Sequence, residues 1–194
     1  MNIAVTTLTG PLVILEPLRK CHLAGLTRAA QESDIWRYMS ADLSIEGTLE
    51  PWYEEARRFE KTGSQLPFAI RWAADGELIG STRYLNIVPQ HLRLEIGWTW
   101  LIPAHWGGQA NAAIKFLLFK NAFEKLGAVR VELRTDVLNK RARRAIAKLG
   151  AVEEGILRNH MMMPGGRVRD TVQFAVIREE WPTIRARLAA RIAN

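Results

Sequence analysis

A glycine turn between a strand-like segment and a long apolar segment most constrains the fold of this chain. Residues 92–100 alternate apolar side chains with polar or small ones, which predicts a half-buried strand. Residues 102–111 read Ile-Pro-Ala-His-Trp-Gly-Gly-Gln-Ala-Asn, and the apolar residues after them cover most of the circumference of a helix that ends near Leu126. The turn is therefore expected to join the end of a strand to the N-terminus of a buried helix.

The same turn has the chemistry of an anion site. Gly107 and Gly108 have no Cβ, so a phosphate can approach the backbone closely. The first N–H groups of a helix have no intrahelical acceptor, and the positive end of the helix dipole lies there. The pattern predicts a phosphate site, with a simple connecting turn as the alternative.

Strand and helix patterns alternate along most of the chain. Short strands are expected over residues 12–15, 68–72, 78–87 and 129–135, and a hairpin is expected to join 152–163 to 168–176. Helices are expected over 22–30, after Thr48 with Pro51 in the first turn, between Asn139 and Gly150, and as an amphipathic C-terminal helix over 183–194. This alternation predicts an α/β (α+β) fold, and 194 residues that are 48% hydrophobic predict a single domain over 1–194.

Composition excludes several classes of protein. No run is long and apolar enough to span a membrane, and residues 1–10 lack the features of a secretory signal, so a cytoplasmic location is expected. Cys21 is the only cysteine, which excludes an intrachain disulfide and a thiolate metal cluster, and it is expected to be a small buried residue on the first helix. No metal site is expected. The net charge of +7 favours an anionic partner, whether a polyanionic cofactor, a nucleic acid or an acidic protein.

Eight short segments occur in an order that is specific as a set. They are Leu-Glu-Pro-Leu (15–18), Glu-Ile-Gly-Trp (95–98), Trp-Gly-Gly-Gln-Ala-Asn (106–111), Asn-Ala-Phe-Glu-Lys-Leu-Gly (121–127), Ala-Ile-Ala-Lys-Leu-Gly-Ala (145–151), Glu-Gly-Ile-Leu-Arg (154–158), Arg-Asp-Thr-Val (169–172) and Arg-Glu-Glu-Trp (178–181). This order resembles the GCN5-related N-acetyltransferase (GNAT) superfamily, in particular the branch that includes ribosomal-protein N-terminal acetyltransferases. The resemblance implies a mixed, mostly antiparallel central sheet, flanked by helices and splayed between its fourth and fifth strands.

The resemblance also implies acetyl-CoA as the acetyl donor and a set of cofactor-binding residues. The pantetheine arm would lie against the strand that carries Trp98, Trp100, Leu101 and Ile102. The backbone amides that would hold the pyrophosphate belong to Gly107, Gly108, Gln109, Ala110, Asn111 and Ala112. Asn139 would contact the pantetheine or its thioester end, or would serve only as a helix cap. The basic face over residues 140–148, with Arg144 as the candidate residue, would attract the 3′-phosphate or would simply be solvated.

The chain departs from the family pattern at four positions. Trp106, Gln109 and Asn111 stand where the phosphate turn usually has Arg or Gln, then Gly, then Gly or Ala. Ala142 stands three residues after Asn139, where a hydroxyl is often found that is suggested to protonate the leaving thiolate. These departures bear on catalysis more than on cofactor binding, because backbone amides survive a change of side chain.

Two residues are candidates for the chemistry, and each has a structural alternative. Glu95 is the candidate base, or else a solvated residue or the ion-pair partner of Arg93. His160 is the second candidate, or else a packing or surface histidine. Trp36 and Tyr38 line an acceptor pocket or cover the core. Cys21 is far in the family order from the glycine turn, so direct attack of the amine, with no acyl-enzyme, is expected.

Three functions are consistent with these patterns. The first is an N-acetyltransferase that moves an acetyl group from acetyl-CoA to a protein N-terminus or a small amine. The second is a non-catalytic relative that binds acetyl-CoA, suggested by Ala142 and Gln109. The third is a basic module that binds a ribosome or RNA. Ribosome association and a homodimer are further expectations about partners, and no membrane association is expected.

Overall fold

The computed structural model describes residues 1 and 5–193 and contains an eight-stranded sheet. The strands lie in the order β1-β2-β3-β4-β5-β6-β8-β7, and β5 and β6 are the parallel pair among otherwise antiparallel neighbours. Their bounds are β1 Leu8–Thr9, β2 Val13–Pro17, β3 Leu66–Trp72, β4 Leu78–Val88, β5 Arg93–Leu101, β6 Arg130–Asp136, β7 Val152–Met162 and β8 Val168–Ile177. The expectation of a mixed, mostly antiparallel sheet is confirmed.

The sheet splays where β5 and β6 meet. The two strands pair only from Arg93 to Glu95 on β5, opposite Arg130 to Glu132 on β6. Beyond these residues β5 runs on to Leu101 and β6 to Asp136 without pairing to each other. Because the two-residue strand β1 was not expected, β5 and β6 are the fourth and fifth of the expected strands, and the predicted position of the splay is confirmed.

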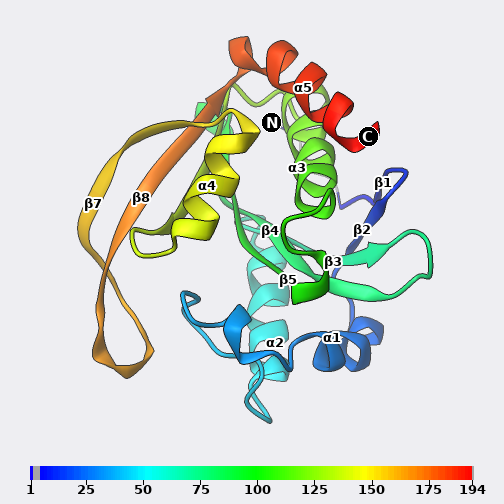
Figure 1. The fold of residues 1–194 in the computed structure, drawn as a ribbon, viewed down its shortest axis with the longest axis vertical. Helices are drawn as coiled ribbons and strands as arrows, with labels where there is room; N and C mark the ends of the chain where they lie inside the picture. Colours follow the sequence, from blue (N-terminus) through cyan, green and yellow to red (C-terminus); the bar gives the residue numbers. More distant parts are fainter. Residues whose placement is uncertain (2–4, 194) are drawn as a thin grey trace.

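Five helices of seven or more residues are described, and they cover both faces of the sheet (Figure 1). One apolar cluster joins the sheet to α3, α4 and α5, and a second joins it to α1 and α2. The bounds of these helices are α1 Leu23–Ala29, α2 Leu49–Lys61, α3 Ala110–Lys120, α4 Lys140–Leu149 and α5 Trp181–Ala193. A π-helical turn, Asn121–Lys125, extends α3 almost to Gly127, which has a left-handed φ of 72° as expected for a C′ residue.

One local expectation was wrong. Cys21 lies on the 3-10 turn Lys20–His22, ahead of α1, and is exposed. Thr48 is the N-cap residue of α2, as its position predicted, but its hydroxyl donates to the carbonyl oxygens of Asp42 and Ile45 and makes no capping hydrogen bond. The final helix begins at Trp181 rather than at residue 183, a smaller difference.

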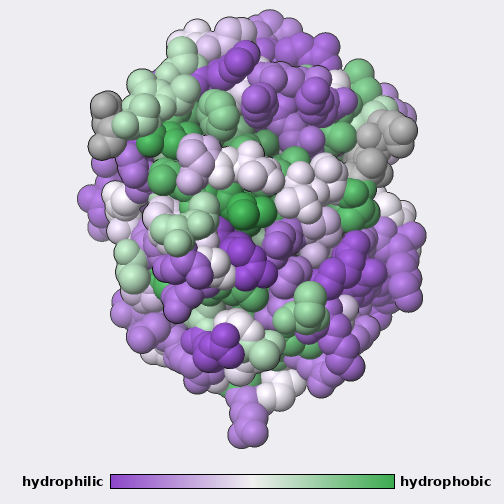
Figure 2. Space-filling model, turned by 90° about the vertical axis from the view of Figure 1, so that its right-hand side faces the viewer, coloured by the Kyte–Doolittle hydropathy of each residue, from purple (hydrophilic) through white to green (hydrophobic). Residues whose placement is uncertain are grey.

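The hairpin of β7 and β8 extends away from the helices (Figure 1). β7 is exposed along almost its whole length, including Ile156 and Leu157. Figure 2 shows the opposite side of the molecule, where hydrophilic residues dominate and hydrophobic residues occur in small groups. None of the helices in the described parts of the chain is long and apolar enough to cross a membrane.

Candidate active site

A cavity of about 510 Å³ opens where β5 and β6 diverge. Its walls come from these two strands, the glycine turn before α3, the first residues of α4, the segment between α1 and α2, and the β7–β8 hairpin. Six of the expected cofactor-binding residues line it, namely Trp98, Trp100, Leu101, Gly107, Asn111 and Asn139. The others, Ile102, Gly108, Gln109, Ala110, Ala112 and Arg144, do not line this cavity.

The glycine turn leaves room for a ligand at the N-terminus of α3. A Cβ at Gly107 or Gly108 would meet no atom within 4 Å, so the space in front of both is open. Gly107 also has a left-handed φ of 76°, which favours glycine. Ala113 N–H donates to the Gln109 carbonyl, so the N–H groups before it precede the intrahelical hydrogen bonds. These observations fit an anionic group held by backbone amides.

The bulk of Gln109 does not fill the turn. Its side-chain nitrogen Nε2 lies 3.4 Å from the Arg191 carbonyl oxygen and 3.3 Å from that of Ile192, both in the last turn of α5. The side chain therefore reaches towards the C-terminal helix. The departure from the family pattern at this position is compatible with an open phosphate site.

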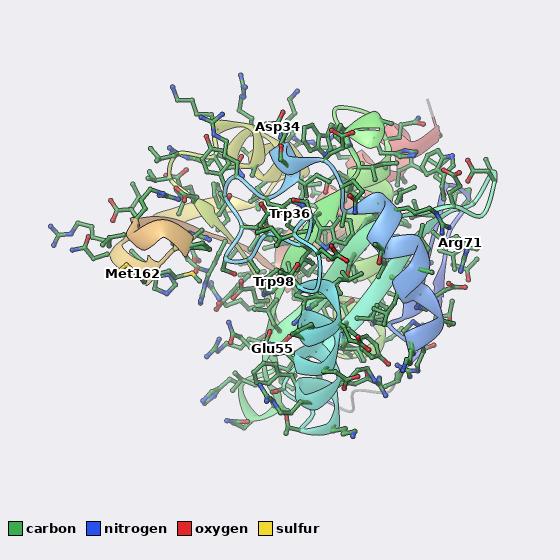
Figure 3. All side chains as sticks on the ribbon, turned by 90° about the horizontal axis from the view of Figure 1, so that it is seen from below. Asp34, Trp36, Glu55, Arg71, Trp98 and Met162 are labelled. Carbon is green, nitrogen blue, oxygen red and sulfur yellow. The ribbon has the colours of Figure 1, made fainter. Side chains whose placement is uncertain are left out.

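The backbone of β5 is distorted beside the cavity. Its pairing with β4 shifts register between Gly97 and Trp100, and Trp98 has a φ of 49°, unusual for a residue other than glycine. Together with the missing pairing to β6, this bulge leaves a strand edge open to a ligand. The Trp98 ring, labelled in Figure 3, lies with its centre 6.3 Å from that of the Trp52 ring. Gly97, an isolated glycine inside the strand pattern, was the sequence signal for this bulge.

Asn139 caps α4, as its sequence position predicted. Its Oδ1 accepts a hydrogen bond of 2.9 Å from the Ala142 N–H, and the residue also lines the cavity. Arg141, which sequence reasoning missed, reaches across from α4 to the glycine turn, where its guanidinium lies 3.4 Å from the centre of the Trp106 ring. Trp106 is fixed in turn by a 2.8 Å hydrogen bond to the Leu101 carbonyl.

Glu95 lies at the point of divergence and is 5% exposed. Its Oε2 accepts a 2.8 Å hydrogen bond from the Asn86 side chain and lies 3.4 Å from the Arg134 guanidinium. Burial raises the pKa of the Glu95 carboxyl, against the opposing effect of Arg134. The suggested ion pair with Arg93 does not form, because Arg93 pairs with Glu132 at 3.4 Å.

His160 of β7 lines the same cavity as Glu95. Its Nδ1 lies 3.0 Å from the hydroxyl of Thr171, and burial is the first cause that lowers the pKa of the imidazole. The nearby positive charges of Arg134 and Arg169 lower it further. Of the two aromatic candidates, Tyr38 lines the cavity, whereas Trp36 is buried against Trp100 with its ring centre 5.1 Å away.

Lys115 is a cavity residue that sequence reasoning missed. It lies on α3, is 4% exposed, and donates a 2.7 Å hydrogen bond from Nζ to the Thr99 hydroxyl. Burial lowers the pKa of Lys115 to about 7. A lysine inside a helix that is apolar on all sides was a signal for a buried amine. Among the described residues, no group of histidine, cysteine or acidic side chains is arranged to hold a metal ion.

The comparisons with known proteins agree with this geometry. Residues 13–152 match the family model described as an acetyltransferase (GNAT) domain. The uncharacterized N-acetyltransferase YoaA of Bacillus subtilis (strain 168) is 28% identical over 113 residues, which cover 56% of this chain and 63% of that protein. The chain thus spans less than two thirds of the length of this curated relative.

Solved structures give the same result over nearly the whole chain. A GCN5-related N-acetyltransferase from Brucella melitensis is 29% identical, with a TM-score of 0.90 and 97% of this chain and 86% of that chain covered. Mycobacterium smegmatis RimJ, solved in complex with CoA-disulfide, is 26% identical, with a TM-score of 0.81 and 96% and 94% covered. The chain belongs to the GNAT acetyltransferase family, in which acetyl-CoA is the acetyl donor.

Proposed function

We propose that this protein transfers an acetyl group from acetyl-CoA to a primary amine by direct attack of that amine on the thioester. The observation that carries the proposal is one cavity that joins two features. An unpaired strand edge and an open glycine turn occupy one end, and Glu95 and His160 lie at the other. The strand edge and the glycine turn suit an extended amide-containing arm with a phosphate. Glu95 and His160 suit proton transfer from an amine.

The cofactor end would hold acetyl-CoA mainly through the backbone. The amides from Gly107 to Ala112 would donate hydrogen bonds to the pyrophosphate, the free edge of β5 from Trp98 to Ile102 would pair with the pantetheine, and Asn139 would lie near the reacting end. Acetyl-CoA supplies an activated acyl group when bound. The space at Gly107 and Gly108 and the end of β5–β6 pairing at Glu95 both fit this group.

At the acceptor end the amine must be neutral to attack. An α-amine is neutral to about 10–20% at pH 7, whereas a lysine is neutral to about one part in a few thousand. Glu95 is buried, and its pKa is raised, so it is suited to take a proton from the amine directly or through water. His160 is the second candidate for this role.

Direct attack is favoured because the cavity offers no thiol. Cys21, the only cysteine in the sequence, lies on the turn before α1 and does not line the cavity. Ala142 lines the cavity without a hydroxyl, so we propose that the leaving thiolate takes its proton from water or from the acceptor amine.

The finer features of this function are also proposals. We propose that residues 1–194 act as one acetyltransferase domain, supported by the packing of Trp181 on Phe123, with ring centres 5.7 Å apart, and by the contact of Gln109 with α5. A cytoplasmic location, a homodimer and association with a ribosome stay proposals of the same kind.

Turnover of acetyl-CoA separates this function from its alternatives. The purified protein is mixed with acetyl-CoA and a panel of amines, and both released CoA and acetylated product are followed by mass spectrometry. A stoichiometric product supports acetyl transfer. Tight CoA binding without product on any amine supports the non-catalytic relative that Ala142 suggests. Salt-dependent RNA binding without CoA binding supports the third alternative.

A further inference from the structure

Arg169 is a buried arginine in the cavity wall that lacks a direct partner at its Nε. It lies on β8, opposite Met161 of β7, and is 9% exposed. Its Nε is buried without a hydrogen-bond partner, and no carboxylate in the part of the chain that the structure describes lies within ion-pair distance of its guanidinium. Burial lowers the pKa of this group. A buried donor without a partner destabilises the folded protein, and more so when it is charged.

The nearby carboxylates already have other partners. Asp136 pairs with Arg167 and accepts a 2.9 Å hydrogen bond from the Leu138 N–H. Glu95 is held by Asn86 and Arg134. Neither carboxylate lies within ion-pair distance of the Arg169 guanidinium, although both attract its charge from further away, and Arg169 Nε has no hydrogen-bond partner.

A second buried arginine shows what a purely structural arrangement looks like. Arg83 also has buried nitrogens without partners, Nε and Nη2, but its guanidinium lies 4.7 Å from the ring centre of Trp52 and 5.1 Å from that of Trp98. It donates to Gln65 and does not line the cavity. Aromatic faces compensate the charge of Arg83, whereas no such faces cover Arg169.

The location of Arg169 ties it to the acceptor. Glu95, His160 and Arg134 line the same cavity, and Arg134 adds a second positive charge. Arg169 pairs with Met161 in the β7–β8 hairpin, next to Met162, which Figure 3 shows at the margin of the molecule. A polycationic acceptor would meet repulsion here. A carboxylate would meet a planar guanidinium that binds it through two hydrogen bonds.

We propose that the acceptor amine carries a carboxylate a few bonds away and that Arg169 binds this carboxylate. The inference rests on the proposed acetyl transfer and names the substrate class of that same site. The carboxylate has two sources, the α-carboxylate of a free amino acid or the side chain of an acidic residue at a peptide N-terminus. Arg169 determines specificity and takes no part in the proton transfer.

The test uses matched acceptors that differ by one charge. The peptide arm compares N-terminal aspartate with N-terminal asparagine in a peptide with an amidated C-terminus. The amino-acid arm compares serine with serinamide, with kcat/KM expressed per neutral amine at each pH because the two amines differ in pKa. At least one carboxylate acceptor is expected to have a kcat/KM tenfold or more above that of its neutral partner. The pair of acceptors that shows this preference identifies the source of the carboxylate.

Substitution of Arg169 then assigns the preference. Arg169→Gln is expected to abolish this preference, measured as the ratio of kcat/KM between the two members of each pair, and Arg169→Lys is expected to keep part of it. The matched control is Arg158→Gln, an exposed arginine of the same hairpin outside this cavity, which is expected to leave the preference unchanged. Equal rates for both members of each pair, or a preference that survives Arg169→Gln, would overturn the inference.

A binding measurement keeps the inference testable without turnover. Calorimetry compares the reaction products, N-acetylserine with N-acetylserinamide and the acetylated aspartyl with the acetylated asparaginyl peptide, on wild-type and Arg169→Gln protein. Selective binding of a carboxylate product that Arg169→Gln removes supports the inference even if no amine is acetylated, a result that would refute only the proposed function. Equal binding of both products would count against Arg169.

Discussion

The two ends of the cavity differ in their chemical groups: one is lined by backbone and the other by side chains. The end proposed for the cofactor consists of backbone, namely the N–H groups of the glycine turn and the free edge of β5. The end proposed for the acceptor consists of ionisable side chains from four strands: Glu95, Arg134, His160 and Arg169. A backbone site tolerates changes of side chain, as Trp106 and Gln109 illustrate, whereas a side-chain site changes its specificity with single substitutions. The cofactor and the acceptor can therefore be perturbed separately.

The acceptor end is expected to give the largest effect on rate. Glu95→Gln keeps the size and the hydrogen-bond acceptor towards Asn86 but removes the base, so kcat is expected to fall about 10²-fold, the lower end for loss of a general base. Steady-state kinetics measures this fall, with circular dichroism to confirm the fold. Cys21→Ala serves as the control and is expected to keep full activity, because Cys21 is exposed outside the cavity.

Two results would contradict this assignment. A normal kcat in Glu95→Gln would remove Glu95 from the chemistry and direct attention to His160. A stable acetyl group on Cys21, detected by mass spectrometry, would overturn direct attack.

The cofactor end is expected to lose affinity rather than chemistry. Gly108→Glu places a carboxylate in the open space before α3, and the CoA affinity is expected to fall tenfold or more, about 1.4 kcal/mol. Calorimetry with CoA measures the change. Gly108→Gln separates charge from size, since a polar side chain of similar volume is expected to have the smaller effect. An unchanged affinity in a folded Gly108→Glu protein would remove the turn from the site.

Lys115 lines the same cavity and leads to a prediction about how stability depends on pH. Its pKa is about 7 in the folded protein and near 10.4 when unfolded, so the unfolded state binds more protons between about pH 7 and pH 10. The stability of the wild type should therefore rise with pH relative to Lys115→Met, by up to about 1.4 kcal/mol per pH unit. Urea unfolding of both proteins at pH 7, 8 and 9 measures the difference. A constant difference across this range would show that the lysine is not neutralised by burial.

The smallest effect is expected at Asn139, where the two ends meet. Asn139→Asp keeps the oxygen that accepts from the Ala142 N–H but removes the amide donor, so turnover or CoA binding should fall several-fold at a nearly native melting temperature. Thermal denaturation and CoA calorimetry on the same sample separate the two roles. Native activity in Asn139→Asp would leave Asn139 as a helix cap only.

The same contrast explains what the sequence could predict. The strand β5, the glycine turn and the cap at Asn139 depend on neighbouring residues, and the structure confirms each, although burial in β5 does not alternate, since Leu94, Glu95 and Ile96 are all buried. The order of the motifs, through the family resemblance, predicted the mixed sheet and its splay. The family match supports acetyl transfer, but it does not test the individual site residues.

The features that the sequence missed depend on long-range contacts. The partner of Glu95 is Arg134, which lies 39 residues further along the chain, so the nearer Arg93 was a reasonable but wrong alternative. The burial of Arg169 carries no local sequence signal, because it is set by the packing of strands that meet only in the folded chain, whereas Gly97 was a local signal for the bulge at Trp98. Cys21 shows that a local expectation can also fail, since it lies on a turn before α1 and is exposed.

The short pairing of β5 with β6 also has a mechanical consequence. The sheet consists of two leaves, β1–β5 and β6–β8, whose backbone seam is only three residue pairs long. Rigidity across the seam therefore depends on side chains that span it, notably the Glu95–Arg134 and Glu132–Arg93 ion pairs, and on Arg141 stacked on Trp106 above the gap. Glu95, the proposed base, therefore also joins the two parts of the sheet through its ion pair with Arg134. The stiffness of the sheet is thus linked to the group proposed for the chemistry.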